Sequence, residues 1–380
     1  MKEIPTPTAI DLFCGAGGIT KALKDAGFEV LCGMDLDQEV LHTYALNHSN
    51  QVIQKDISDV QPEEVLSCCK IEPGELTLLA GCPPCQGFSK QNGKRVDKDP
   101  RNLLLLEYGR LVKALKPRYI FLENVPGILP SEIFQELLDM IAVRKKRNKS
   151  RYYVSFKTVA AADYGVPQRR YRFVLVGKRS DLVEDLKEVE QLFAGPTHID
   201  PLKWTKGSDL KKWVTVKQAI GKLPAIRAGE KSDKDELHRA GNLSELNLLR
   251  IQNTPHNGGG RVDWPPHVVS ADGNTIELGL ACHKKEGIGY QDVYGRMDFD
   301  FIAPTLTGGC NTITKGRFGH PTQDRPISLR EAALLQTFPK EYKFEGSIQK
   351  IAQWIGNAVP VRMGNVFFKQ ILKDYFGEVL

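Results

Sequence analysis

The first 180 residues alternate short, nearly continuous apolar runs with amphipathic stretches of helical period. Apolar runs of about four to eight residues are typical of strands that are buried on both faces of a sheet. The predicted strands are 9–13, 30–34, 52–54, 76–80, 119–122, 153–158 and 173–176, and the predicted helices are 19–26, 38–47, 103–115 and 132–143. This alternation predicts an α/β fold, a doubly wound sheet with its ligand site at the carboxyl ends of the strands.

The pattern changes after residue 180. Residues 195–325 are rich in Gly, Pro, Asn, Thr and His, and only 236–251 has helical periodicity there. Such a segment predicts a loop-rich second domain. Helical patterns return at 328–336 and 360–375. We therefore expect a ligand-binding domain in 1–180, a smaller loop- and β-rich domain in 181–325, and a segment in 326–380 that returns to the first domain.

Composition narrows the class of protein only slightly. The chain has 380 residues, a formal net charge of +6 and a pI near 8.7. This mildly basic balance is compatible with a nucleic-acid partner, but a metabolic enzyme can carry the same surplus. The sequence has no apolar run of membrane-spanning length, and residues 1–5 do not resemble the start of a signal peptide. We expect a cytoplasmic protein with no membrane partner.

A glycine-rich loop follows the first predicted strand and opens the first predicted helix. Residues 11–18 read D-L-F-C-G-A-G-G, and Thr20 stands where a dinucleotide fingerprint has its third glycine. Asp35 ends the second strand, where a carboxylate can accept hydrogen bonds from ribose hydroxyls. Asp56 ends the third strand, and its carboxylate can accept a hydrogen bond from the amino group of adenine. These residues indicate an adenosine-containing ligand, but they do not separate NAD from S-adenosylmethionine.

A second motif combines a thiol with a carboxylate. In Cys82-Pro83-Pro84-Cys85 the two prolines stiffen the turn and present one sulfur to a pocket. Glu123 ends a later apolar run and can face the same pocket. A thiolate and a protonatable carboxylate can together add a nucleophile to an aromatic heterocycle while protonating its ring.

Two other interpretations of this C-x-x-C spacing are a redox pair and half of a zinc site. A thioredoxin-like pair should open a helix, whereas a polar, glycine- and lysine-bearing loop follows Cys85. A zinc site needs a second pair at suitable spacing, and Cys68 and Cys69 are adjacent in sequence. We therefore favour a nucleophilic cysteine and expect no metal.

In their order along the chain, these motifs resemble those of the DNA cytosine-5 methyltransferase family, in its bacterial or phage form. The matching segments are 11–18, 35, 56, 81–89, 123–125, 168–172, 326–339 and 356–359. The resemblance implies a Rossmann-like mixed sheet that binds S-adenosyl-L-methionine, and a target-recognition domain in 181–325. It also implies a DNA methyltransferase activity on cytosine.

The resemblance assigns a set of residues to the cofactor. Phe13 is expected to pack on S-adenosylmethionine, and the G-N-x-V segment 356–359 to fold back beside the first strand. Asn357 taken alone would be a helix-cap or turn residue. The implied cofactor contacts are Phe13, Gly15, Ala16, Gly17, Gly18, Asp35, Leu36, Asp56, Ile57, Pro84, Asn357 and Val359.

The implied mechanism begins with addition of the Cys85 thiolate to C6 of cytosine. Glu123 protonates or hydrogen-bonds N3, although a strand-end carboxylate that simply pairs with a basic neighbour is the alternative for this residue. Arg172 donates to the base O2 and favours the thiolate, while Arg170 holds a phosphate or orients the site. The cytosine must leave the duplex stack, and the polar loop 93–101 is expected to help hold it out.

The DNA contacts are predicted partly from the motifs and partly from two glycine-bearing loops, 256–261 and 305–311. Arg and Asn side chains can make bidentate contacts with base edges. The alternative is that the glycines serve only tight turns. The basic run 144–151 closes a helix and is interpreted as a solvated helix end rather than a phosphate contact. The predicted DNA-binding residues are Gln86, Ser89, Arg101, Arg261, Thr305 and Asn311.

Two rival functions share this fold. A tRNA cytosine-5 methyltransferase has a Cys-Phe-Thr signature in its second domain, whereas this chain reads Cys310-Asn311-Thr312, which favours DNA. A catalytically idle DNA-binding module would not need Cys85, Glu123 and Arg172. We expect a stand-alone monomer that acts on double-stranded DNA, with a restriction endonuclease as a functional rather than a physical partner.

Overall fold

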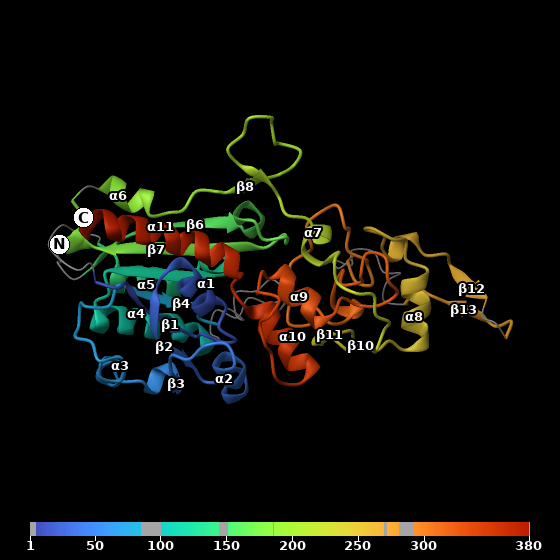
Figure 1. Ribbon diagram of the computed structural model, residues 1–380, viewed down its shortest axis with the longest axis horizontal. Helices are drawn as coiled ribbons and strands as arrows, with labels where there is room; N and C mark the ends of the chain where they lie inside the picture. Colours follow the sequence, from blue (N-terminus) through green and yellow to red (C-terminus); the bar gives the residue numbers. More distant parts are fainter. Residues whose placement is uncertain are drawn as a thin grey trace. The chain divides into compact units, whose positions relative to one another are not determined.

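The computed structural model describes residues 5–84, 100–143, 151–184, 186–269, 272–280 and 292–379. The chain forms two compact units (Figure 1). The first contains the residues up to 164, 171–197 and those from 358 onward, and the second contains 165–170 and 198–357.

The first unit is built on a seven-stranded mixed sheet with strand order β3-β2-β1-β4-β5-β7-β6. Strand β7 runs antiparallel to both of its neighbours, and the other pairs are parallel. All seven predicted strands are confirmed. Their bounds are β1 Thr8–Leu12, β2 Glu29–Asp35, β3 Gln51–Gln54, β4 Leu78–Gly81, β5 Tyr119–Asn124, β6 Tyr152–Ala160 and β7 Tyr171–Arg179.

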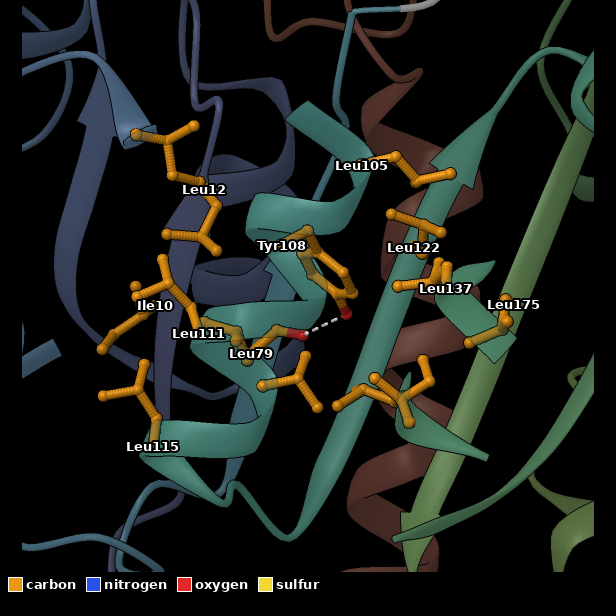
Figure 2. Close-up of a cluster of buried hydrophobic side chains, with 14 of the residues drawn as sticks. Ile10, Leu12, Leu79, Leu105, Tyr108, Leu111, Leu115, Leu122, Leu137 and Leu175 are labelled. Carbon is orange, nitrogen blue, oxygen red and sulfur yellow. Dashed lines mark hydrogen bonds between the residues drawn. The ribbon is translucent and has the colours of Figure 1, made fainter. Parts of the chain in front are cut away.

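Helices cover both faces of this sheet because successive side chains of a strand point to opposite sides. On β5, Ile120 and Leu122 join the apolar cluster that includes α4 and α5, whereas Phe121 stacks against Phe367 and Phe368 of α11. Figure 2 shows the first cluster, in which Tyr108 of α4 lies among leucines of the sheet. The helices of this unit are α1 Gly18–Ala26, α2 Gln38–Ala45, α3 Pro62–Cys69, α4 Leu104–Leu115, α5 Glu132–Ile141, α6 Leu186–Gln191 and α11 Val361–Val379.

The second unit has short strands and long connections, as its composition predicts. Its strand pairs are the parallel pair β8–β9 and the hairpins β10–β11 and β12–β13. The elements are β8 His198–Ile199, β9 Lys211–Lys212, α7 Val216–Ile220, β10 Lys231–Ser232, β11 Asp235–Arg239, α8 Glu245–Gln252, β12 His267–Val269, β13 Thr275–Glu277, α9 Leu329–Leu335 and α10 Ile348–Asn357.

Two expectations differ from this architecture. The helical pattern of 236–251 divides into strand β11 and helix α8, because Gly241 interrupts it and Ser244 caps α8 through its hydroxyl. Residues 326–357 belong to the second compact unit, so the chain returns to the first at residue 358 rather than 326. The reason is packing: α9 and α10 lie against each other, and α9 also packs against β11 and α7.

Among the helices that the structure describes, none combines the length and the apolar character needed to cross a membrane.

Candidate active site

The glycine-rich loop between β1 and α1 has a backbone that ordinary residues avoid. Phe13, Gly15 and Gly17 have φ angles of 60°, 50° and 86°. A positive φ is common for glycine but costly for an aromatic residue, so Phe13 is held in a strained conformation by its surroundings. Strain of this kind concentrates where a loop is shaped for a ligand.

Asp35 anchors this loop to the end of β2. Its Oδ2 accepts a hydrogen bond from the Gly15 amide at 2.9 Å, and its Oδ1 accepts one from the Asp37 amide at 3.0 Å. Burial raises the pKa of this carboxyl, and the two amide bonds partly oppose the shift. Asp35, which the sequence predicted to bind a ligand, thus also fixes the glycine-rich loop.

A buried polar chain supports the same loop and was missed by the sequence argument. The Thr20 hydroxyl donates to Oδ2 of Asp11 at 2.7 Å and lies 2.9 Å from the Tyr44 hydroxyl, to which Asn50 donates at 2.7 Å. A Cβ on Gly33 would lie 2.5 Å from that hydroxyl, so glycine leaves the space that Tyr44 occupies. Thr20, which looked like a missing glycine, therefore anchors Asp11.

Asp11 itself is fully buried, and its Oδ1 has no hydrogen-bond partner among the described residues. Burial raises the pKa of its carboxyl to about 7, against the opposing hydrogen bond from Thr20. A buried carboxyl with a spare oxygen, next to a strained loop, is typical of a site that a ligand completes.

The remaining predicted cofactor residues have varied surroundings. Asp56 caps a short 3₁₀ helix, Ile57–Asp59, by accepting from the Ser58 amide at 3.0 Å. The bond from the Ser58 hydroxyl, together with this amide bond, lowers the pKa of Asp56. Leu36 is 60% exposed, whereas Ile57 and Val359 are buried. The other members are Ala16 and Gly18, which are buried, Pro84, which is half-buried, and Asn357, which is exposed at the end of α10.

Glu123 is the centre of a three-residue cluster in the first unit. It is the penultimate residue of β5 and is only 3% exposed. The Nε of Arg172 on β7 lies 2.9 Å from Oε1 of Glu123. The thiol of Cys82, which follows β4, donates to Oε2 at 3.0 Å. The structure thus brings two predicted site residues, Glu123 and Arg172, together as an ion pair, which is compatible with both interpretations of Glu123.

The described residues after β4 end at Pro84, directly before Cys85. Asn124 donates to the Pro83 carbonyl at 3.2 Å and so joins the end of β5 to the residues that precede Cys85. Cys85, Gln86 and Ser89 lie outside the described residues. Arg101 lies in the 3₁₀ helix Pro100–Leu103, and its side chain is likewise not described.

Arg170 belongs to the second unit and is buried there. Its guanidinium donates to the carbonyls of Leu306 and Gly356, both at 3.0 Å. A Cβ on Gly356 would lie 2.3 Å from the Thr307 carbonyl, so the two segments approach closely at this glycine. Of the two roles expected for Arg170, this burial favours orienting the site over contacting a phosphate.

The predicted DNA loops are held by contacts within the second unit. The Thr305 hydroxyl donates to the Arg169 carbonyl, and Arg317 donates to the carbonyls of Gly258 and Gly259 at 2.6 and 2.9 Å. Arg261, which begins the 3₁₀ helix Arg261–Asp263, and Asn311 are both half-buried. These contacts fix the backbone of both loops within the second unit.

Two ion pairs within the second unit involve the matching segment 326–339. Glu331 accepts from Arg325 at 2.7 and 2.8 Å, and Arg330 pairs with Asp235 at 2.6 Å. Burial tends to raise the pKa of Glu331, but the Arg325 bonds outweigh it and hold that pKa below its usual value.

Comparison with known proteins identifies the family. Residues 8–373 match the family model described as C-5 cytosine-specific DNA methylase. The type II methylase M.HgiDII of Herpetosiphon aurantiacus is 38% identical over 370 residues, which cover 95% of this chain and 94% of that protein. The type II methyltransferase M1.HphI of Haemophilus parahaemolyticus is 30% identical over 369 residues, with coverages of 96% and 87%.

A similar architecture occurs in a solved structure of a DNA modification methyltransferase encoded within a prophage of E. coli. The TM-score is 0.67 at 23% identity, and the alignment covers 97% of this chain and 99% of the other. This likeness supports the fold, and the sequence matches carry the assignment. The chain therefore belongs to the C-5 cytosine-specific DNA methylase family.

Proposed function

We propose that this protein transfers a methyl group from S-adenosylmethionine to C5 of a cytosine that is flipped out of a specific duplex DNA sequence. The observation that carries the proposal is the buried Glu123, held by Arg172 and Cys82 beside the strand end that leads to Cys85. A protonatable group next to a nucleophile is the arrangement that addition to a heterocycle requires.

The residues of the first unit fit the proposed cofactor. The positive φ angles of 13, 15 and 17 open the loop for close approach of a ligand, and the spare oxygen of buried Asp11 gives the site unmet polar capacity. Phe13, Asp35 and Asp56 would hold its adenosine part. When bound, S-adenosylmethionine supplies an electrophilic methyl group on its sulfonium.

The proposed chemistry of the chain's own residues is a covalent addition followed by elimination. The Cys85 thiolate forms a bond to C6 of cytosine while Glu123 protonates N3, which leaves C5 electron-rich enough to take the methyl group. Water then takes the C5 proton, the electrons of that C–H bond re-form the C5–C6 double bond as the bond between C6 and the Cys85 sulfur breaks, and N3 returns its proton to Glu123. Arg172 keeps Glu123 in place and donates to the base O2.

We assign base-sequence recognition to residues 181–325, and phosphate and substrate contacts to Gln86, Ser89 and Arg101. Two similar proteins are named as type II enzymes, which supports a role in restriction–modification with a cognate endonuclease that need not bind this chain. We further propose that the enzyme acts as a monomer.

Bisulfite sequencing of plasmid DNA from cells that express the protein tests this function. We expect full protection of one cytosine in a short recurring sequence, and no protection in cells that express Cys85→Ser. Unmodified plasmid together with a new 5-methylcytosine in the tRNA of the same cells would contradict the proposal in favour of an RNA substrate.

A further inference from the structure

Cys82 presents its thiol to the carboxyl group of Glu123 from a fixed backbone position. The Cys82 amide donates to the Leu12 carbonyl at 3.3 Å, which ties the residue to the end of β1. The preceding Gly81 packs so tightly that a Cβ there would lie 2.8 Å from the Tyr108 ring. The Sγ atom of Cys82 lies 3.0 Å from Oε2 of Glu123. The contact joins β4 to β5 at the strand end where the proposed chemistry takes place.

The two oxygens of Glu123 have partners of different chemistry. Oε1 lies 2.9 Å from Nε of Arg172 in an ion pair, and a guanidinium neither loses its proton nor accepts one. The proton of a neutral Glu123 therefore belongs on Oε2, the oxygen that faces Cys82. A thiol donates to a carboxylate oxygen and accepts weakly from a carboxylic O–H, so Cys82 can accompany Oε2 in both protonation states.

We propose that Cys82 is a positioning residue whose thiol holds Oε2 of Glu123, the oxygen that delivers the proton to cytosine N3. The inference rests on the proposed function, because it assumes that Glu123 acts on the base. It gives the first cysteine of the C-x-x-C motif a role that is neither redox nor nucleophilic. It also requires no atom of Cys82 to touch the substrate.

Two substitutions separate the donor from the bulk of the side chain. Cys82→Ala removes the hydrogen-bond donor, whereas Cys82→Ser keeps a hydroxyl donor of similar size. Cys82→Val fills the space without a donor and replaces the alanine variant if that protein melts early. Cys68→Ala is the matched control, since Cys68 is a half-buried thiol on α3 that bonds Gln51 and not Glu123.

The measurement is the single-turnover methylation rate at saturating S-adenosylmethionine and DNA, with the affinities for both measured separately. A hydrogen bond to a charged group is large enough that its loss should slow the step by about tenfold. We expect this loss for Cys82→Ala with both affinities unchanged, a rate within about threefold of wild type for Cys82→Ser, and no effect of Cys68→Ala.

A double-mutant comparison shows whether Cys82 acts through Glu123. If it does, Cys82→Ala should cause no further loss in a Glu123→Gln background. An equal loss in both backgrounds, or a Cys82→Ser variant as slow as Cys82→Ala, would overturn the inference and leave the proposed function intact. A Glu123→Gln enzyme with the wild-type rate would overturn both.

Discussion

At the scale of single residues, Glu123 is the side chain on which the proposed chemistry most depends. General acid catalysis is typically worth ~10²–10⁴-fold in rate, so Glu123→Gln should slow single-turnover methyl transfer by that range. The amide keeps the shape of the side chain but has no acidic proton, so the affinity for S-adenosylmethionine should change little. Rapid-quench kinetics measure the rate, and binding isotherms measure the affinity for S-adenosylmethionine. A near-normal rate would reject the role of Glu123 as a general acid.

Asp11 makes a second prediction at this scale, in the pH dependence of stability. Its pKa is about 7 in the folded protein and 3.8 in an unfolded chain, so the folded form holds an additional proton between these values. Its contribution to stability is therefore present below pH 3.8 and is lost as the pH rises through 7. Asp11→Asn cannot ionise, so it should gain stability over the wild type by up to about 1.4 kcal/mol per pH unit across this window.

Denaturant unfolding of both proteins at several pH values between 4 and 8 measures the difference. The gain should level off above pH 7. A difference that does not change with pH would show that Asp11 is ionised throughout in the folded protein.

At the scale of elements, the packing of β4 against α4 determines how tightly the sheet positions the segment that leads to Cys85. A Cβ at Gly81 would lie 2.8 and 2.9 Å from two carbons of the Tyr108 ring. The Tyr108 hydroxyl is itself fixed by the Phe121 carbonyl at 3.1 Å and the Leu79 carbonyl at 3.4 Å, and Figure 2 draws the bond to Leu79. Gly81→Ala should therefore destabilise the fold by about 1–3 kcal/mol through overpacking. Thermal unfolding measures the loss.

Gly195→Ala is the control for this prediction, because nothing lies within 4 Å of a Cβ at that position. It should unfold at or above the wild-type temperature. Equal melting temperatures for the two variants would mean that α4 shifts to accept the methyl group.

Elements of the first unit were predictable because their signals are local. Buried strands read as apolar runs, and helix α5 begins at Ser131, which caps it through its hydroxyl. Helix α3 was missed because Pro62–Cys69 has a weak apolar face, with Val65 as its single fully buried side chain. The prediction of one helix over 236–251 was wrong because it rested only on the spacing of apolar residues. That spacing does not reveal the ion pair with Arg330 that holds Asp235 in strand β11.

The sequence predicted site residues only where they belong to recognisable motifs. The resemblance assigned Glu123 and Arg172 to one site, but it did not predict the ion pair between them. The bond from Cys82 to Glu123 joins residues 41 positions apart, and the polar chain from Asp11 to Asn50 joins three elements. Contacts of this kind depend on strand order and register, which periodicity does not reveal.

At the scale of the whole molecule, the chain divides its motifs between the units. The matching segment 168–172 passes from the second unit to the first between Arg170 and Tyr171. The G-N-x-V segment 356–359 passes between the same units from Asn357 to Ala358. One motif thus supplies Arg170 to the second unit and Arg172 to the first. The boundaries predicted from composition missed these short crossings because each is only a few residues long.

If residues 181–325 read the DNA sequence, changes at Arg261 or Asn311 should relax or alter which sites are methylated. Base-edge contacts supply discrimination of about 1–3 kcal/mol per good pair, whereas phosphate contacts supply affinity without selectivity. Profiling of methylated sites across a plasmid measures the change for each variant.

The matched controls are Lys145→Ala and Lys146→Ala, two positions of the basic run that lie outside the described residues. They should at most weaken binding uniformly and flatten its salt dependence. An unchanged preference after both loops are replaced would place recognition elsewhere in 181–325.

The central claim is that Cys85 forms a covalent bond with the target base, and DNA with 5-fluorocytosine at the methylated position tests it most directly. Fluorine cannot leave as the C5 proton does, so the elimination step stops and the enzyme remains attached. The wild-type protein and Cys82→Ser should give a denaturation-resistant complex in the presence of S-adenosylmethionine, and Cys85→Ser should give none. A trapped complex from Cys85→Ser, or the absence of one from a folded Cys82→Ser protein, would contradict the account.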